Sequence, residues 1–339
     1  MPTPTPVPED PARAAGPVGF PLPPTEAAPI LTVTLNAAWD VTYRVPRMRA
    51  HSAHRVDEVA ERPGGKGVNV SRVLAALGVP TVATGFLGGP AGDRLDAALA
   101  RLAPSVTREF EPCAGETRRT LGVVDAHTGD TTQFNEPGPQ VTAAEWTAFQ
   151  ERYARLLGPE GPGIGAVALC GSLPPGVPVG AYATLVRAAH AAGVPVLLDT
   201  GGEALRRGVA ARPTWIKPNA AELAELTGSR DPLTAARDAR RRGARTVIAS
   251  LGPDGLLATG PAGTWRAAPP RALRGNPTGA GDSAVAGLLS ALAQGLPWPA
   301  PLGRAAALSA ATVATPAAGE FDPATYAELL PAVAVTEGR

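Results

Sequence analysis

The segment 276–283 combines residue types that can hold and transfer a phosphoryl group. It runs into an Ala- and Leu-rich stretch with helical spacing, so Gly279, Ala280 and Gly281 are predicted to form the first turn of a buried helix. Backbone N–H groups in such a turn have no partner within the helix, and with the helix dipole they favour an anion. Asp282 would then act as a base that takes a proton from an attacking hydroxyl group. An ordinary capped glycine turn is the alternative interpretation.

A second glycine-rich loop precedes another predicted helix. Gly64, Gly65 and Lys66 open the stretch 68–78, which ends at a glycine typical of a helix C-cap and carries Asn69 in its first turn. The loop is not a P-loop, because no Ser or Thr follows the lysine and the glycine spacing differs. Two such helix starts, one with an acid and the other with a lysine, predict two polar or phosphate-bearing ligands that meet between them.

Lysine is rare in this chain, although 31 residues are Lys or Arg. Lys66 and Lys217 are the only lysines, and each lies close to an asparagine, Asn69 or Asn219. A guanidinium group cannot replace an ammonium group where a compact cation must fit, so both lysines are candidates for ligand contact. Chance remains an alternative with so few residues.

Three other polar side chains allow either a ligand role or a local structural one. Asn219 and Glu222, three residues apart at a predicted helix start, would suit Mg²⁺ held mainly through water and nucleotide phosphates. The same spacing describes a capping box. Asp40 follows the predicted strand 30–35, at the end where α/β sheets bind ligands, or it is a turn-forming aspartate.

Composition excludes several functional classes. The formal net charge of +1 gives no general field for nucleic acid or membranes. No apolar run reaches the ~18 residues of a membrane-spanning helix, and no signal peptide is evident. The two cysteines are too few for a disulfide framework, and the four histidines lack metal-ligand spacing. We therefore expect a soluble cytoplasmic protein.

The chain is predicted to begin with a disordered Pro-rich tail, residues 1–29, followed by alternating strands and helices. The segments 41–62 and 117–135 have the pattern of a sheet exposed on one face. The alternation elsewhere predicts a mainly parallel sheet with helices on both faces. The other predicted strands are 81–89, 166–170, 195–199, 214–217 and 246–250, and the other helices are 146–157, 181–192, 221–227 and 234–242.

The chain resembles the PfkB (ribokinase-like) carbohydrate kinases, in the branch of 1-phosphofructokinase, tagatose-6-phosphate kinase and 6-phosphofructokinase-2. Two family signatures match, 64–89 and 276–283, and the loops 171–176, 217–222 and 250–255 lie between them in the family order. The resemblance implies a three-layer α/β/α sandwich over residues 30–331 with a small β-sheet lid from about 41–62 and 117–135. Lids in this branch commonly pair, which implies a homodimer.

The resemblance also assigns roles to individual residues. It implies Asp282 as the catalytic base, with the Gly279, Ala280 and Gly281 amides as an anion hole. It implies a sugar-binding set: Asp40, Gly64, Gly65, Lys66, Asn69 and Arg118, the last near a substrate phosphate. It implies an ATP site lined by Lys217, Asn219, Ser250, Leu251, Gly252, Pro253, Asp254, Gly255 and Gly281. It implies that Asn219 and Glu222 govern Mg²⁺, through water.

Two departures from the family pattern concern the acceptor. The branch usually has Asn-Pro-Ala-x-Asp after the first strand, and this chain has Ala37 in place of that proline. Where many members have Asn and Lys in the lid, Thr120 and Gly122 stand here. An amide and a cation are thus absent near the acceptor's phosphate end; Arg119 or Arg55 could replace the charge.

The expected reaction is transfer of the γ-phosphoryl group of Mg·ATP to a ketohexose phosphate: fructose 1-phosphate, tagatose 6-phosphate or fructose 6-phosphate. A kinase for an unphosphorylated hexose or nucleoside is the first alternative, which the departures in the lid favour. A non-catalytic sugar or nucleotide sensor is the second. A Rossmann dehydrogenase is excluded, because no Gly-x-Gly-x-x-Gly follows the first strand.

Overall fold

The computed structural model describes residues 27–271, 273, 275–315 and 318–338. The predicted disordered tail, residues 1–29, lies outside the described residues except for its last three. Within the described ranges no helix is both long and apolar enough to cross a membrane.

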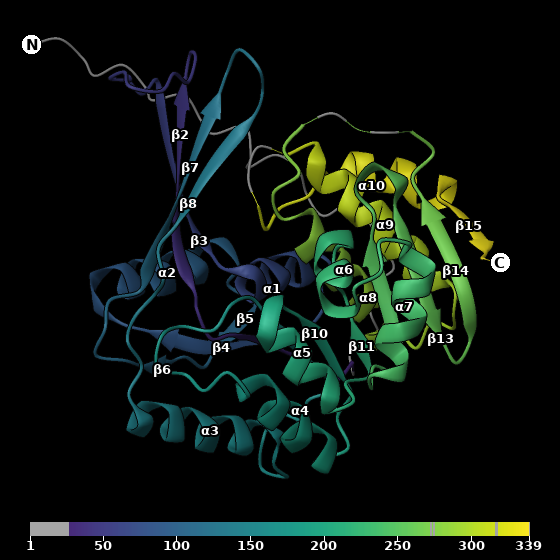
Figure 1. The fold of residues 1–339 in the computed structure, drawn as a ribbon. Coiled ribbons are helices and arrows are strands. Elements are labelled where there is room, and N and C mark those ends of the chain that lie inside the picture. Colours follow the sequence, from purple (N-terminus) through teal and green to yellow (C-terminus); the bar gives the residue numbers. More distant parts are fainter. Residues whose placement is uncertain (1–26, 272, 274, 316–317, 339) are drawn as a thin grey trace, which may run out of the picture.

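A large sheet forms the middle layer of the described chain (Figure 1). Its strand order is β15-β14-β13-β12-β11-β10-β9-β1-β4-β5, and β6 also pairs with β4. The neighbours from β5 through β4, β1, β9, β10 and β11 to β12 pair in parallel. The pairs β12–β13, β13–β14 and β14–β15 are antiparallel. The strands are β1 (Ile30–Thr34), β4 (Thr81–Leu87), β5 (Val106–Arg108), β6 (Glu111–Pro112), β9 (Ala166–Cys170), β10 (Val196–Asp199), β11 (Trp215–Ile216), β12 (Thr246–Ser250), β13 (Leu256–Gly260), β14 (Gly263–Ala268) and β15 (Ala334–Glu337).

Helices cover both faces of this sheet, and successive strand residues divide between the two cores. Leu198 of β10 packs in the core with α3 to α7, whereas its neighbour Leu197 packs in the core with α1, α8, α9 and α10. Successive strand side chains point to opposite faces, so each face buries its own apolar set. The predicted three-layer α/β/α sandwich is confirmed. The helices are α1 (Lys66–Ala76), α2 (Gly89–Leu102), α3 (Ala143–Leu157), α4 (Ala181–Ala191), α5 (Gly202–Ala210), α6 (Ala220–Thr227), α7 (Pro232–Arg241), α8 (Ala280–Ala293), α9 (Ala300–Val313) and α10 (Pro323–Leu329).

A second sheet of four strands projects from the layered body (Figure 1). Its order is β3-β2-β7-β8, in which β2 is antiparallel to β3 and parallel to β7. The strands are β2 (Ala38–Val45), β3 (Glu58–Gly64), β7 (Arg118–Asp125) and β8 (Thr131–Asn135). All five residues of β8 are exposed. We call these four strands and their turns the lid.

Candidate active site

The two glycine loops lie together, because α1 and α8 pack side by side with their first turns in contact. The Asn69 side-chain amide in α1 donates a hydrogen bond to Asp282 Oδ2 in α8, with an N–O distance of 2.8 Å. Both residues are buried. Asp282 stands in the first turn of α8, where the sequence predicted it. A side chain from the first glycine-rich motif therefore contacts a side chain from the second.

The turn before α8 leaves three backbone N–H groups available to an anion. Gly279, the N-cap, has φ +84°, a left-handed conformation that favours glycine. The Ala280 amide, predicted as an anion donor, donates instead to the Pro277 carbonyl oxygen, at 3.1 Å. The Gly279, Gly281 and Asp282 amides have no hydrogen-bond acceptor among the described residues. These three N–H groups therefore form the candidate anion hole.

A buried carboxylate at the end of β10 joins the two lysines of the chain. Lys66 Nζ lies 3.0 Å from Asp199 Oδ1, and Lys217 Nζ lies 3.4 Å from Asp199 Oδ2. Burial acts to raise the pKa of Asp199, but the Lys217 and Lys66 ammonium groups together outweigh it and hold that pKa below its usual value. The sequence analysis placed Asp199 at the end of the predicted strand 195–199 and gave it no role.

Lys217 also lies against the candidate anion hole. A Cβ atom added to Gly281 would be 3.3 Å from Lys217 Nζ, so the ammonium group is next to the free Gly281 amide. The Lys217 side chain is only 4% exposed. A cation and a backbone donor thus face the same small space, which suits a phosphate oxygen.

The electrostatic environment of Asp282 suits a base near neutral pH. Burial raises the pKa of Asp282 to about 7, and the Asp199 carboxylate acts in the same direction. Lys66, the Asn69 amide and Lys217 act in the opposite direction. A general base works best when its pKa lies near the working pH.

Asp40 occupies a tight position where β2 of the lid meets the first glycine loop. A Cβ atom at Gly64 would overlap the Asp40 carboxylate, so the glycine is needed for this packing. Burial raises the pKa of Asp40 to about 6, against the Thr120 hydrogen bond and the Arg118 and Arg72 charges. The carboxylate is therefore held on the lid side of the site.

Arg118 and Arg119 differ in their availability to a ligand. Arg118 is half-buried, and its guanidinium donates to the carbonyl oxygens of Asn36 and Glu136, both at 3.2 Å. Arg118 and Asn36 also line a cavity of about 520 Å³ beside Ser172. Arg119 forms a paired contact with the Glu136 carboxylate, with Nη2–Oε1 at 2.8 Å. In this structure the Arg119 charge is therefore paired with Glu136 on the surface of the lid.

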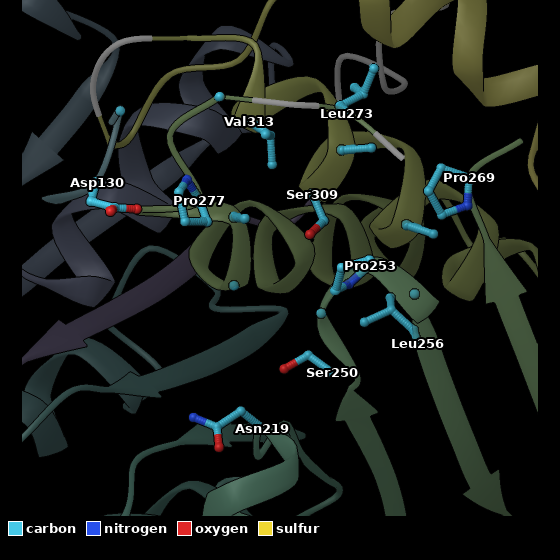
Figure 2. A pocket seen from close by; sticks show the side chains of 18 of the residues that line it. Asp130, Asn219, Ser250, Pro253, Leu256, Pro269, Leu273, Pro277, Ser309 and Val313 are labelled. Carbon is cyan, nitrogen blue, oxygen red and sulfur yellow. The ribbon is translucent and has the colours of Figure 1, made fainter. Parts of the chain in front are cut away.

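A cavity of about 780 Å³ opens between the anion hole, the end of β12 and α9 (Figure 2). Of the predicted ATP-site residues, Leu251, Asp254 and Lys217 are not part of its lining, and Leu251 packs on the core instead. The other predicted residues line it: Asn219, Ser250, Gly252, Pro253, Gly255 and Gly281. Side chains that the sequence did not predict complete the walls: Thr128, Asp130, Leu256, Pro269, Leu273, Pro277, Ala306, Ser309, Ala310 and Val313.

The lid reaches this cavity as well as the acceptor side. Thr128, Gly129 and Asp130 form the turn between β7 and β8 and line the cavity. Figure 2 shows Asp130 beside Pro277, at the entrance to the loop before α8. Asp130 and Pro277, 147 positions apart in the chain, therefore line the same cavity, which no local signal in the sequence indicated.

Asn219 and Glu222 form the capping box at the start of α6. The Asn219 side chain accepts from the Glu222 amide at 2.9 Å, and Glu222 Oε2 accepts from the Asn219 amide at 2.8 Å. Glu222 Oε1 has no protein donor among the hydrogen bonds of the described residues. The described residues contain no cluster of three His, Cys, Asp or Glu side chains that could hold a metal by itself. Mg²⁺ is usually bound through few carboxylates, water and phosphates, so this donor set fits an indirect magnesium site.

The chain is similar to known carbohydrate kinases in sequence and in fold. The chain matches the pfkB family of carbohydrate kinases over residues 32–325. It is similar to phosphofructokinase-2 from Escherichia coli solved with substrates and products, at 26% identity and a TM-score of 0.82, covering 90% of this chain and 99% of that one. A Thermotoga maritima protein described as a possible 1-phosphofructokinase gives 27% identity and a TM-score of 0.82, covering 91% and 99%. Ribokinase from Arabidopsis thaliana shares the fold, at 21% identity and a TM-score of 0.67, covering 90% and 99%.

Proposed function

Because the chain belongs to the pfkB family of carbohydrate kinases, we propose that it transfers the γ-phosphoryl group of ATP to a hydroxyl group of a ketohexose phosphate. The observation that carries the proposal is the buried Asp282 carboxylate, held by Asn69 beside the free Gly281 amide. The candidate acceptors are fructose 1-phosphate, tagatose 6-phosphate and fructose 6-phosphate. Similarity to the two phosphofructokinase structures supports a phosphorylated ketohexose.

The proposed reaction needs one proton transfer and a site for negative charge. The acceptor hydroxyl group would lie against Asp282, which takes its proton as the oxygen attacks the γ-phosphorus. The bond from the γ-phosphorus to the bridging oxygen breaks, and ADP leaves with that oxygen. The Gly281 and Asp282 amides and the Lys217 ammonium group stabilise the charge on the equatorial oxygens. Bound Mg²⁺ would supply further charge neutralisation of the phosphates, and Glu222, with Asn219, would hold it through water.

The proposed acceptor site lies between the first glycine loop and the lid. Asp40, Lys66 and Asn69 would contact the sugar. Gly64 and Gly65 would present their backbone beside these side chains, and the lack of a side chain at Gly64 makes room for the Asp40 carboxylate. Arg118 would contact the phosphate from the cavity that it shares with Asn36 and Ser172. Closing the lid over these groups would exclude water and limit hydrolysis of ATP.

A kinase for an unphosphorylated sugar is the second candidate, favoured by the lid. The Arg119 charge is paired with Glu136, so Arg118 is left as the cation of these two that can face a substrate phosphate. One half-buried arginine binds a phosphate less strongly than a cluster of cations does.

We also propose that the lid mediates a homodimer. Two large apolar side chains of the lid are exposed to an unusual extent, Val59 of β3 at 56% and Phe134 of β8 at 53%. A projecting sheet with exposed apolar residues is typical of a surface that packs against a partner. We infer that the lid of a second copy of the chain packs against this surface.

The acceptor is identified by an ADP-release assay with Mg·ATP across the three ketohexose phosphates, free fructose, free tagatose and a nucleoside. We expect kcat/KM for one ketohexose phosphate to exceed that for the free hexoses by about 100-fold or more, because only a sugar phosphate offers Arg118 an anionic group. Asp282→Asn measures the background of ATP hydrolysis. A higher kcat/KM for a free hexose would replace the first candidate by the second, and sugar binding without ADP release would indicate a sensor.

The pH dependence of kcat/KM reports the proposed base. The ionised Asp282 carboxylate is the active form, so the rate should fall as the pH drops through the pKa of about 7. Below it, log kcat/KM should decline with a slope of one. The measurement uses saturating Mg²⁺ and a sugar phosphate concentration corrected for ionisation of the phosphate. A profile flat down to pH 5 would contradict the assignment of Asp282.

A further inference from the structure

The only two lysines of the chain converge on one carboxylate in the candidate site. Lys66 begins α1, Lys217 follows β11, and Asp199 ends β10, so three separate elements meet there. Each lysine takes a different oxygen of the carboxylate. The Asp199 side chain is 1% exposed, whereas that of Lys66 is 39% exposed. The carboxylate is therefore inaccessible to a ligand, and the Lys66 cation in front of it is accessible.

The two lysines lie toward different parts of the site. Lys217 lies next to Gly281, at the candidate anion hole that the γ-phosphate would occupy. Lys66 belongs to the glycine loop that the proposed acceptor would contact, and its pKa is raised, chiefly by Asp199, against burial and with help from Asp282 and Glu222. A single aspartate thus connects the donor side with the acceptor side.

We propose that Asp199 is a positioning residue that fixes Lys66 and Lys217 relative to each other and so sets the alignment of acceptor and donor. This inference rests on the proposed function. Lys217 Nζ makes one contact of 3.4 Å with Asp199 Oδ2, so at least two of its three N–H groups do not face the carboxylate. The Lys217 N–H groups can therefore point to a phosphate oxygen while the charge is held in place.

An ordinary structural ion pair does not explain this arrangement. A buried carboxylate requires compensation by at least one cation, and Lys217, itself buried, would suffice for that purpose. The second contact is made by Lys66, whose side chain is 39% exposed. Water can solvate this ammonium group, so its charge does not require a buried carboxylate. Restricting that flexible ammonium group is useful where a ligand must be met in a defined position.

The test compares Asp199→Asn with the wild type and with Asp238→Asn. Asp238 also pairs with two cations, Arg241 and Arg242, but on the outer face of α7. For Asp199→Asn we expect kcat/KM to fall by about 100-fold for both substrates. The acid limb of the profile should move to lower pH, because the Asp199 charge helps to raise the pKa of Asp282. Asp238→Asn should resemble the wild type in both respects.

A second measurement does not depend on activity. Since the chain has two lysines, a sample labelled with [¹³C,¹⁵N]lysine gives two ammonium signals by NMR. We expect both signals to move in Asp199→Asn, with faster exchange of the ammonium protons with water, and neither to move in Asp238→Asn. Unchanged signals, or a loss of thermal stability with an unmoved acid limb, would overturn the positioning role. If the wild type releases no ADP with any sugar, the proposed function fails while the NMR comparison still decides whether Asp199 fixes the lysines.

Discussion

Asp282→Asn is expected to lower kcat by about 10⁴-fold, the upper range for loss of a general base, while ATP binding stays close to that of the wild type. The amide has nearly the shape of the carboxylate, and its oxygen can still accept the hydrogen bond from Asn69. It cannot take a proton from the acceptor hydroxyl group. Single-turnover rates and calorimetric titration with ATP separate the two effects.

The variant should also be at least as stable as the wild type at pH 8. The pKa of Asp282 is raised in the folded state from 3.8 to about 7, so the folded protein holds this proton more tightly than the unfolded chain does. Stability therefore falls as the pH rises between those two values, and the neutral amide removes that loss. Thermal unfolding at pH 5 and pH 8 checks the sign. An active Asp282→Asn enzyme would eliminate the proposed mechanism.

Gly279→Ala is expected to reduce kcat by about 10²- to 10³-fold, as for loss of an anion-hole donor. The added Cβ atom would lie 2.9 Å from Ala318 Cα, and φ at this position is +84°. To relieve the overlap with Ala318 and the unfavourable φ, the turn that directs the Gly281 and Asp282 amides must move. Steady-state kinetics at saturating ATP and acceptor measure the loss.

Gly295→Ala is the matched control for the backbone strain. Gly295 follows the other end of α8 and has φ +66°, but a Cβ atom there would meet nothing within 4 Å. It should cost about 1 kcal/mol of stability from the left-handed conformation and leave kcat unchanged. Equal effects of the two substitutions on kcat would remove the anion-hole assignment.

The parts of the fold that the sequence predicted well carry strong local signals. The strand 30–35 is a β-branched run and appears as β1, Ile30–Thr34. The predicted helix 146–157 begins at Ala143, because Thr142 and Glu145 form a capping box that the sequence analysis did not use. The predicted strand 81–89 ends at Leu87, since Gly89 already begins α2. Helix α9 was missed because its Ala-rich sequence is buried on nearly all sides and shows little periodicity.

The residues of the candidate site also differ in how far the sequence predicted them. Gly279 and Asp282 could be placed from the sequence, because a glycine turn before an apolar helix is a local pattern. The loss of the Ala280 amide to Pro277 depends on the geometry of one turn, and the sequence did not reveal it. The role of Asp199 and the presence of the lid turn in the cavity depend on contacts between segments far apart in the chain. Such pairings are fixed by the packing of the whole molecule, and the local pattern of a single sequence carries no trace of them.

The turn 128–130 belongs to the same hairpin as Arg118, and it bounds the 780 Å³ cavity on one side. Under the proposed function, this hairpin would thus contact both reactants, the sugar phosphate through Arg118 and the nucleotide through the turn 128–130. An outward movement of the hairpin that releases the sugar would expose the nucleotide site to solvent at the same time. The release of both products would then depend on one conformational change of the hairpin and not on two independent ones.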